Sequence, residues 1–570
     1  MINSVAMRQI PMRLWIWAVL SGALQVLPFP IAGPTPLWRT MVCWFALTPL
    51  LAALVSQNAV RQPLRIRDGA LLGYCAGFIW YLGNCYWIFR TMHYYGGISE
   101  PASAGILALF CLYLGLYHAL FGALVVAILR RFGRTQALLL TPFVWVAVEL
   151  ARSRITGFPW DLLGTAQVDN LLLTRLAPIA GVYGISFVIA AVNTLWLAKF
   201  TLRQRRHTRT FLIAACAAVV VFYIVALRRV TRPIREGTQA TATLLQENLE
   251  VGEASQYAGP PLSEQRELQQ FSELSLSPPL SYCAGIPELP STKCINVISS
   301  ISADSFTNSA AANLIVWPEA PNNFIESAPA VRGAVSALAR QANAPVIIGD
   351  VRYRTDPSVP GGYDSAHYNS ASFFRPDGSS AGRYDKMHLV PFGEYVPYKK
   401  LFFFAGDLLG DAGDFSAGSQ RSVFRSDGHT VGVFICYESV FPDEIRRFVG
   451  RGADVLVNIS DDGWYGDTSA AWEHLNMVRM RAIENHRWIL RATNTGVTAA
   501  IDPYGRVVRS APRHQRTALR VGFDYEQDTT FYTAHGDWFA YLCSLVTAAA
   551  FGLSFNRHRP LKHNPAAPGD

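Results

Sequence analysis

The sequence predicts an α-helical membrane domain of about eight spans that is joined to a soluble α/β domain. Three observations favour this fold class. Long apolar runs fill the first part of the chain, short β-like runs alternate with helix-like stretches in the second part, and charged residues are scarce. Of the 570 residues, 51% are hydrophobic and 16% are charged, whereas soluble domains carry about 25% charged residues. This composition excludes a disordered or fibrous protein and disfavours an entirely soluble one.

The apolar runs are long enough to cross a bilayer, which requires roughly 20 mostly apolar residues. We interpret the first run as a membrane span and not as a cleaved signal peptide, because many similar runs follow it. Seven of the runs lie before residue 235, and the eighth follows after a long interval. The predicted spans are 14–32, 38–56, 69–89, 103–129, 137–151, 178–200, 211–227 and 536–555.

Positive charge is concentrated around the first seven predicted spans. Residues 1–235 hold 22 Lys and Arg against five acids, a net charge of +17, and the rest of the chain has a net charge of −8. Arginines gather in alternate loops, for example at Arg61, Arg130 and Arg203, and such loops face the cytoplasm. The basic excess therefore indicates orientation in a membrane, and no nucleic-acid partner is expected.

The same patterns divide the chain into three parts. We expect a membrane domain at 1–235, an external domain at 236–535, and a last span with a short cytoplasmic tail at 536–570. Both termini are then cytoplasmic, and the external domain lies in the periplasm of a Gram-negative cell, beside the inner membrane. Within that domain, residues 251–296 are polar and rich in Ser, Pro and Glu, which predicts a flexible insert.

Strand-like and helix-like stretches alternate through the external domain, which is typical of an α/β fold. Helix-like stretches cover 330–342 and 470–486. Short apolar runs predict strands at 242–245, 313–317, 346–349, 430–436 and 454–459.

The nine cysteines fall into three groups. Six lie within or beside spans and are interpreted as small apolar residues. Cys283 and Cys294 lie in the external insert, where they could pair in an oxidising compartment, and the sequence leaves this open. No pair has zinc-ligand spacing, so no metal is expected. His474 and His486 have no ligand partner at metal spacing and are interpreted as structural.

Cys436 stands apart because it closes a strand-like run, where its side chain can meet a substrate. Two other segments carry suitable partners: Glu319 ends an apolar run, and Lys386 lies in a polar turn before a Pro-Gly loop. A carboxylate can take the thiol proton, and an ammonium stabilises both a thiolate and the oxyanion of a tetrahedral intermediate. Taken singly, these residues have ordinary structural interpretations, but together they predict nucleophilic catalysis.

Several motifs around these residues resemble the nitrilase (carbon–nitrogen hydrolase) superfamily, and most closely its membrane-embedded branch, the apolipoprotein N-acyltransferases. The layout of spans, soluble domain and final span is also similar, so the resemblance covers essentially the whole chain. The motifs are Thr156–Trp160 (TGFPW), Trp317–Glu319 (WPE), Tyr384–Pro397 (YDKMHLVPFGEYVP), Cys436–Glu438 (CYE), Ser460–Gly466 (SDDGWYG) and Trp472–Gly496.

The resemblance implies a nitrilase-like αββα sandwich and a Glu319, Lys386 and Cys436 catalytic triad. It further implies that Glu394, Tyr437 and Glu438 support the triad. Trp464 and Tyr465 follow a turn-forming sequence, and exposed aromatics near a membrane favour lipid contact. Trp160 is a further candidate for lipid contact.

The implied reaction is acyl transfer through a thioester on Cys436, without a cofactor. The partners would be a phospholipid acyl donor, a diacylglyceryl apolipoprotein acceptor and the bilayer itself. One alternative is a membrane-tethered amidase or nitrilase acting on a small soluble substrate, which does not explain eight spans. Another is a transporter or scaffold with an inactive domain. The scarcity of acids in the first seven spans argues against ion-coupled transport.

Overall fold

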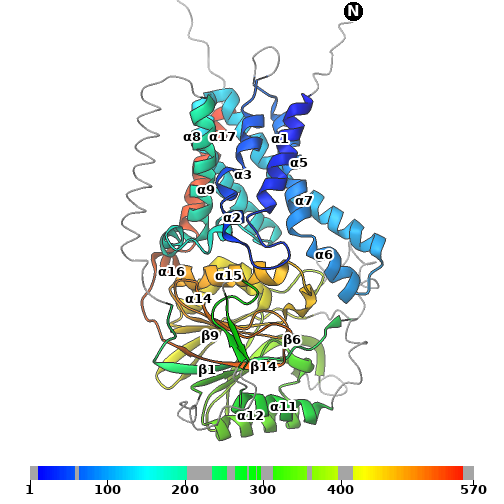
Figure 1. Ribbon diagram of the computed structural model, residues 1–570, viewed down its shortest axis with the longest axis vertical. Helices are drawn as coiled ribbons and strands as arrows, with labels where there is room; N and C mark the ends of the chain where they lie inside the picture. Colours follow the sequence, from blue (N-terminus) through cyan, green and yellow to red (C-terminus); the bar gives the residue numbers. More distant parts are fainter. Residues whose placement is uncertain are drawn as a thin grey trace, which may run out of the picture.

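The computed structural model describes nine stretches of the chain, and its membrane helices and its β-sheets form opposite ends of the molecule (Figure 1). The helical bundle occupies the upper end of the view, and two stacked sheets occupy the lower end. Helices lie between the sheets and the bundle, and further helices cover the far side of the sheets. The described residues are 10–57, 63–201, 234–252, 263–278, 281–290, 292–296, 312–355, 363–395 and 415–555.

The helical bundle is built from the apolar runs of the first part of the chain and the last described helix. The second predicted span consists of three short helices, α2 (Leu37–Thr40), α3 (Cys43–Ala46) and α4 (Thr48–Leu54), with a proline in the first turn of α4. The longer helices are α1 (Met12–Val26), α5 (Ile66–Asn84), α7 (Glu100–Phe132), α8 (Arg134–Ala151), α9 (Ala177–Thr201) and α17 (Trp538–Phe555).

Three helical segments among the described residues are long and apolar enough to cross a membrane, namely Leu37–Leu54, Glu100–Phe132 and Leu173–Lys199. Two shorter apolar helices cover Met12–Val26 and Trp538–Ser554. The predicted span at 211–227 lies outside the described residues. These helices are those of a membrane protein, and the number of eight spans stays a prediction.

Helices α5 and α7 pack closely because glycines recur at every fourth position on the facing side of α5. A Cβ atom at Gly73 would lie 2.1 Å from the carbonyl oxygen of His118, and one at Gly122 would lie 2.1 Å from that of Gly69. Such small residues let two helix backbones approach each other in a membrane, where close packing holds helices together.

The soluble part is a sandwich of two β-sheets. In the six-stranded sheet the order is β14-β1-β4-β5-β6-β7, and in the eight-stranded sheet it is β3-β2-β13-β12-β11-β10-β9-β8. The strands of the first sheet are β1 (Ala240–Gln246), β4 (Leu314–Val316), β5 (Val346–Thr355), β6 (Tyr363–Phe374), β7 (Ser380–Asp385) and β14 (Thr517–Phe523). Those of the second are β2 (Ser281–Cys283), β3 (Cys294–Asn296), β8 (Val423–Ser426), β9 (His429–Ile435), β10 (Val455–Ser460), β11 (Ile489–Thr493), β12 (Ala499–Ile501) and β13 (Val507–Ser510).

Helices complete the sandwich on both outer faces (Figure 1). Helices α11 (Glu264–Leu276) and α12 (Pro329–Ala342) bury apolar residues such as Phe271 and Val335 against the six-stranded sheet. Helices α14 (Pro442–Val449) and α15 (Ala470–Asn485) lie between the eight-stranded sheet and the helical bundle. The five strands and two helices that the sequence predicts here are thus present, with bounds shifted by at most two residues, except that β5 continues to Thr355, six residues beyond its predicted end.

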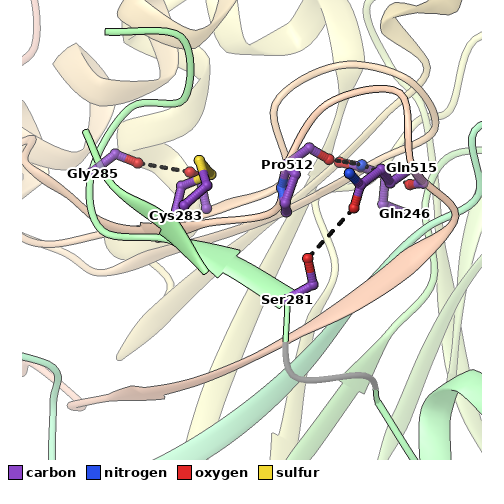
Figure 2. Close-up of a disulfide and its surroundings, with 8 residues drawn as sticks. Gln246, Ser281, Cys283, Gly285, Pro512 and Gln515 are labelled. Carbon is purple, nitrogen blue, oxygen red and sulfur yellow. Dashed lines mark hydrogen bonds between the residues drawn. A yellow bond between two sulfur atoms is a disulfide. The ribbon is translucent and has the colours of Figure 1, made fainter. Parts of the chain in front are cut away.

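The sequence predicts a flexible insert at 251–296, but the described parts of this segment form a helix and two strands. Helix α11 forms here because Leu268 and Phe271 share one face and bury it against the sheet. Strands β2 and β3 pair with each other and extend the eight-stranded sheet. Cys283 and Cys294 form a disulfide across this hairpin (Figure 2), which answers the question that the sequence leaves open.

The soluble sandwich rests on the helical bundle through α15 and the turn after β9. Glu484 of α15 accepts a hydrogen bond from the backbone N–H of Val182 in α9, at 2.9 Å. The hydroxyl of Tyr437 donates to the carbonyl oxygen of Gly157 at 2.9 Å. Tyr437 also belongs to the hydrophobic cluster formed by the bundle helices. The residues that follow β9 therefore lie at the junction of the two parts.

Candidate active site

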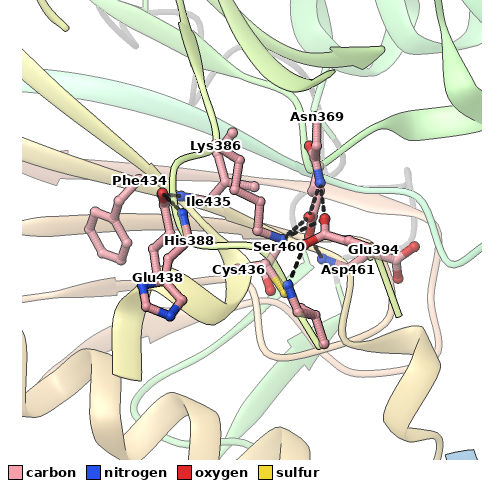
Figure 3. Close-up of polar contacts among 12 residues, drawn as sticks. Asn369, Lys386, His388, Glu394, Phe434, Ile435, Cys436, Glu438, Ser460 and Asp461 are labelled. Carbon is pink, nitrogen blue, oxygen red and sulfur yellow. Dashed lines mark hydrogen bonds and ion pairs between the residues drawn. The ribbon is translucent and has the colours of Figure 1, made fainter. Parts of the chain in front are cut away.

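The three predicted catalytic residues lie just beyond the ends of three strands. Glu319 follows β4, Lys386 directly follows β7, and Cys436 directly follows β9. Strands β4 and β7 belong to one sheet and β9 to the other, so the site forms where the two sheets face each other. Figure 3 shows the Lys386 side chain and the backbone N–H of Asp461 directed toward a common centre, with Cys436 beside it. The structure therefore brings the predicted residues together from distant parts of the sequence.

Lys386 is held between two carboxylates. Its ammonium lies 3.1 Å from Oε1 of Glu319 and 2.9 Å from Oε1 of Glu394. All three side chains are buried, and the Lys386 side chain is 1% exposed. Burial alone would lower the pKa of Lys386, but Glu319 and Glu394 raise it well above its usual value. The lysine is therefore a fixed positive charge in the site.

Asn369 is a member of this network that the sequence analysis misses. Its amide Nδ2 donates to Oε1 of Glu319 at 2.7 Å and to Oε1 of Glu394 at 2.8 Å. The backbone N–H of Asp461 donates to the other oxygen of Glu319 at 2.8 Å. Asn369 lies in the middle of β6, and no motif marks it, so only the register of β6 against β7 reveals its position.

Cys436 has a backbone conformation that is uncommon for a residue with a side chain. Its φ angle is +46°, and a short 3₁₀ helix, η8 (Cys436–Val440), begins at this residue. Strained backbone of this kind occurs at sharp strand-to-helix turns that present a nucleophile. Burial and the charge of Glu319 raise the pKa of the Cys436 thiol well above its usual value, and Lys386 acts in the opposite direction. The resting thiol is protonated, so it requires a base.

Glu438 connects the nucleophile turn to the loop that carries Lys386. Its Oε1 accepts hydrogen bonds from the Tyr384 hydroxyl at 2.5 Å and from the backbone N–H of Met387 at 2.8 Å. Its Oε2 accepts from the backbone N–H of Ile435 at 2.8 Å. Burial raises the pKa of Glu438, and these donors lower it in part. Glu438 therefore aligns the two loops with each other.

A second buried network lies behind Cys436. His474 Nε2 is 3.1 Å from the carbonyl oxygen of Cys436, and Nδ1 is 2.9 Å from Oδ1 of Asp462. Arg491 forms an ion pair with the same carboxylate. Burial alone would raise the pKa of Asp462, but Arg491 and His474 lower it. Both ring nitrogens of His474 have protein partners, which agrees with its structural interpretation.

The three aromatic candidates for lipid contact lie in different environments. Trp464 is 44% exposed, whereas Tyr465 is 8% and Trp160 is 1% exposed. Tyr465 packs against Trp160 and against Trp87 of the bundle. The rings of Tyr465 and Trp160 fill the junction of the two domains, whereas Trp464 is exposed. Lipid contact stays a prediction for all three residues.

One group of described residues has the composition of a cation site. Ligand atoms of His486, Glu526 and Asp528 lie within 4.8 Å of one another. Asp528 is already paired with His486 at 2.8 Å and with Arg487 at 3.3 Å. None of these residues belongs to the hydrogen-bond network around Lys386 and Cys436.

The sandwich of two sheets covered by helices has the fold of a carbon–nitrogen hydrolase, and the family models agree. The carbon-nitrogen hydrolase model matches residues 260–527, and the apolipoprotein N-acyltransferase N-terminal domain model matches residues 21–195. The chain belongs to the apolipoprotein N-acyltransferase family.

Curated relatives extend over nearly the whole chain. An apolipoprotein N-acyltransferase of Geobacter metallireducens is 32% identical over 96% of this chain and 96% of its own length. Another from Methylococcus capsulatus is 32% identical over 90% of this chain and 94% of its own.

Two solved structures are similar to about half of this chain. An amidase from Nesterenkonia sp. is 16% identical, covers 55% of this chain and 98% of its own, and has a TM-score of 0.35. A carbon-nitrogen hydrolase from Helicobacter pylori is 16% identical, covers 56% of this chain and 95% of its own, and has a TM-score of 0.33. The family assignment rests on the curated relatives and on the two family models.

Proposed function

We propose that this protein transfers an acyl chain from a phospholipid to the α-amine of the N-terminal diacylglyceryl-cysteine of an apolipoprotein. This reaction is the last step of lipoprotein maturation. The observation that carries the proposal is the position of Cys436, which lies at the junction of the catalytic domain and the helical bundle. The hydroxyl of the next residue, Tyr437, donates a hydrogen bond to the carbonyl oxygen of Gly157 in the helical bundle. A nucleophile at this junction suits two substrates that are both anchored in a membrane.

In the first half-reaction, Glu319 takes the proton of the Cys436 thiol, and the thiolate attacks the ester carbonyl of the phospholipid. Lys386 stabilises the oxyanion of the tetrahedral intermediate. The ester C–O bond then breaks, and the leaving alkoxide receives the proton from Glu319. The products are a thioester on Cys436 and a lysophospholipid. The raised pKa of the thiol supports the need for this base.

In the second half-reaction, the free α-amine of the acceptor attacks the thioester carbonyl. Glu319 takes the proton of the attacking amine and returns it to the sulfur as the C–S bond breaks. Lys386 again stabilises the oxyanion, and the product is an amide. Asn369 and the backbone N–H of Asp461 hold the Glu319 carboxylate for both steps. Glu394, Glu438 and Tyr437 act as positioning residues.

The division into 1–235, 236–535 and 536–570, with eight spans and an external catalytic domain, belongs to the same proposal. The Cys283–Cys294 disulfide supports a position of this domain in the periplasm, because disulfides persist in oxidising compartments. The bundle would then be embedded in the inner membrane with the catalytic site facing its outer leaflet. A tethered amidase acting on a soluble substrate is not favoured, because the family match includes residues 21–195.

Product analysis tests the proposed reaction. Purified full-length protein in detergent micelles is incubated with a phospholipid of defined acyl chains and a synthetic diacylglyceryl peptide. We expect an N-acylated peptide and an equivalent amount of lysophospholipid, and neither product from the Glu319→Gln variant. Release of free fatty acid with no acylated peptide would instead indicate hydrolysis and contradict the proposal.

A further inference from the structure

Two carboxyl groups meet where the membrane-side loop rests on the catalytic domain. Asp161 follows the TGFPW motif in the loop after α8, and Glu473 lies in the first turn of α15. Their exposed fractions are 1% and 0%. Neither residue belongs to the catalytic network around Cys436, so the mechanism described above does not use them.

The hydrogen bonds around this pair leave one oxygen of each carboxyl group without a donor. Asn84 Nδ2 donates to Oδ2 of Asp161 at 2.6 Å, and Trp160 Nε1 donates to Oε2 of Glu473 at 2.6 Å. Asp161 Oδ1 and Glu473 Oε1 are buried and have no hydrogen-bond donor among the described residues. Trp160, which donates to Glu473, directly precedes Asp161, so the two carboxyl groups lie side by side, where a hydrogen bond between them requires a proton on one of them. Two ionised carboxylates cannot form such a bond, because neither has a hydrogen to donate.

The surrounding charges do not neutralise two carboxylates. The cation that faces the pair is Arg152, which also interacts with Glu149 and lies over the rings of Trp80 and Tyr81. The other groups around the pair are neutral: the thiol of Cys85, the amide of Asn84, the indoles of Trp87 and Trp160, and the hydroxyl of Ser469. Two buried negative charges beside one shared cation would be strongly unfavourable.

We propose that Asp161 and Glu473 share one proton, and that this acid–carboxylate pair is a pH-sensitive clasp that holds the TGFPW loop against α15. One carboxyl group then donates to the free oxygen of the other. The shared proton therefore adds one hydrogen bond to those that already join the membrane domain and the catalytic domain. Burial raises the pKa of Asp161 above its usual value, and burial together with the charge of Asp161 raises that of Glu473 well above its usual value.

The clasp lies close enough to the nucleophile to position it. The ring of Trp160 stacks on Tyr437 with centroids 6.5 Å apart and on His474 with centroids 5.9 Å apart. His474 in turn contacts the carbonyl oxygen of Cys436. Asp161 and Glu473 are therefore positioning residues, which act on the site through Trp160. This consequence for acyl transfer rests on the proposed function, whereas the shared proton does not.

The shared proton sets the direction of a pH effect. In the unfolded chain both carboxyl groups lose their protons near pH 4, whereas the folded pair keeps one proton to a higher pH. Above about pH 4.5 the folded state therefore binds one proton more than the unfolded state. Its folding equilibrium constant then falls about tenfold for each pH unit, until the pair loses the proton in the folded state.

The test compares the full-length protein in detergent micelles with Glu473→Gln and Asp161→Asn, which supply a permanent hydrogen-bond donor. Thermal unfolding is followed at intervals from pH 5 to pH 9. We expect each variant to gain thermal stability relative to wild type as the pH rises. Glu264→Gln, which changes an exposed carboxylate at the start of α11, serves as the matched control and should follow wild type at every pH. A stability difference that is the same at every pH would indicate a structural role alone and overturn the proposal.

Infrared difference spectra provide a second readout that needs no substrate. The difference spectrum of wild type minus Glu473→Gln at pH 7 should contain the carbonyl stretch of a protonated carboxylic acid. Absence of this band would overturn the proposal. Acyl loading of Cys436 should then decline at alkaline pH in wild type and persist in Glu473→Gln. If thermal and infrared results are as expected but no acyl transfer occurs at any pH, the proposed function fails and the clasp stands. If acyl transfer occurs with parallel pH profiles in wild type and Glu473→Gln, the positioning role of the clasp is overturned and the proposed function stands.

Discussion

Residue by residue, the site depends on hydrogen bonds that fix charged side chains in a buried place. Glu319 receives hydrogen bonds from Asn369, Lys386 and the backbone of Asp461, so its carboxylate has little freedom to turn. A base held in this way can alternate between the thiol, the leaving group and the amine without reorganisation, which is the basis of electrostatic preorganisation. Misplacement of such a group costs much of its effect.

Asn369 offers a direct test of this alignment. Asn369→Ala removes the donor shared by Glu319 and Glu394, and we expect acyl loading of Cys436 to slow about a hundredfold. The rate is measured from lysophospholipid release in a single turnover. Asn313→Ala, at an exposed asparagine beside β4, should leave the rate unchanged. An Asn369→Ala enzyme as fast as wild type would show that Glu319 needs no such support.

Among the elements, the loops after the strands carry the chemistry, and their positions were predictable to different degrees. The sequence identifies Glu319 and Cys436 because each follows an apolar run, it identifies Lys386 in a polar turn before a Pro-Gly loop, and all three belong to recognisable motifs. It does not identify Asn369, because the role of this residue depends on the pairing of β6 with β7 and not on its neighbours in sequence. The strands and helices of the sandwich follow the hydrophobic pattern. Helix α11 was missed because its polar face dominates the composition of the insert.

The burial of Tyr465 and Trp160 has a similar explanation. Sequence pattern predicts an exposed aromatic turn from Ser460–Gly466, but it gives no information on which ring the helical bundle covers. The turn forms a 3₁₀ helix, η9 (Asp462–Tyr465), whose backbone accepts a hydrogen bond from Thr91 of the bundle at 3.0 Å. In this arrangement Trp464 is exposed and Tyr465 is buried against the bundle.

The two aromatics of η9 should therefore respond differently to truncation. Tyr465→Ala empties a packed site, so we expect the free energy of unfolding to fall by about 3 kcal/mol, as judged by thermal or denaturant unfolding. Trp464→Ala should leave stability nearly unchanged and slow acyl loading from phospholipid vesicles. Its reaction with a small soluble thiol reagent at Cys436 should match wild type. Equal loss of both reactivities in Trp464→Ala would mean that this ring holds the fold and does not contact lipid.

For the whole molecule, the account requires a catalytic domain that sits on the outer surface of the membrane with its nucleophile at the junction. The described contacts support this arrangement, since α15 and the turn after β9 both bond to the helical bundle. The alternating arginine loops predict the orientation, although several of them lie outside the described residues. Contacts between the two domains also connect the clasp of Asp161 and Glu473 to the site, because Trp160 stacks on His474, which contacts the carbonyl oxygen of Cys436.

The orientation can be measured on the whole chain. If the chain has eight spans, its carboxyl terminus is cytoplasmic. A reporter fused after Asp570 should then be active when it is of a kind that works in the cytoplasm, and inactive when it is of a kind that works in the periplasm. A second fusion after Pro512, in the soluble domain, should be active only with a periplasmic reporter. Periplasmic activity of the fusion after Asp570 would contradict both the span count and the predicted side of the carboxyl terminus.

The identity of the acylated residue tests the central claim most directly. The full-length protein is incubated with phospholipid in the absence of an acceptor, and the acyl group is located by mass spectrometry of the intact thioester. We predict one acyl chain on Cys436, its release by a diacylglyceryl peptide, and no adduct or turnover in Cys436→Ala. An acyl group on any other cysteine, together with an active Cys436→Ala enzyme, would contradict the account.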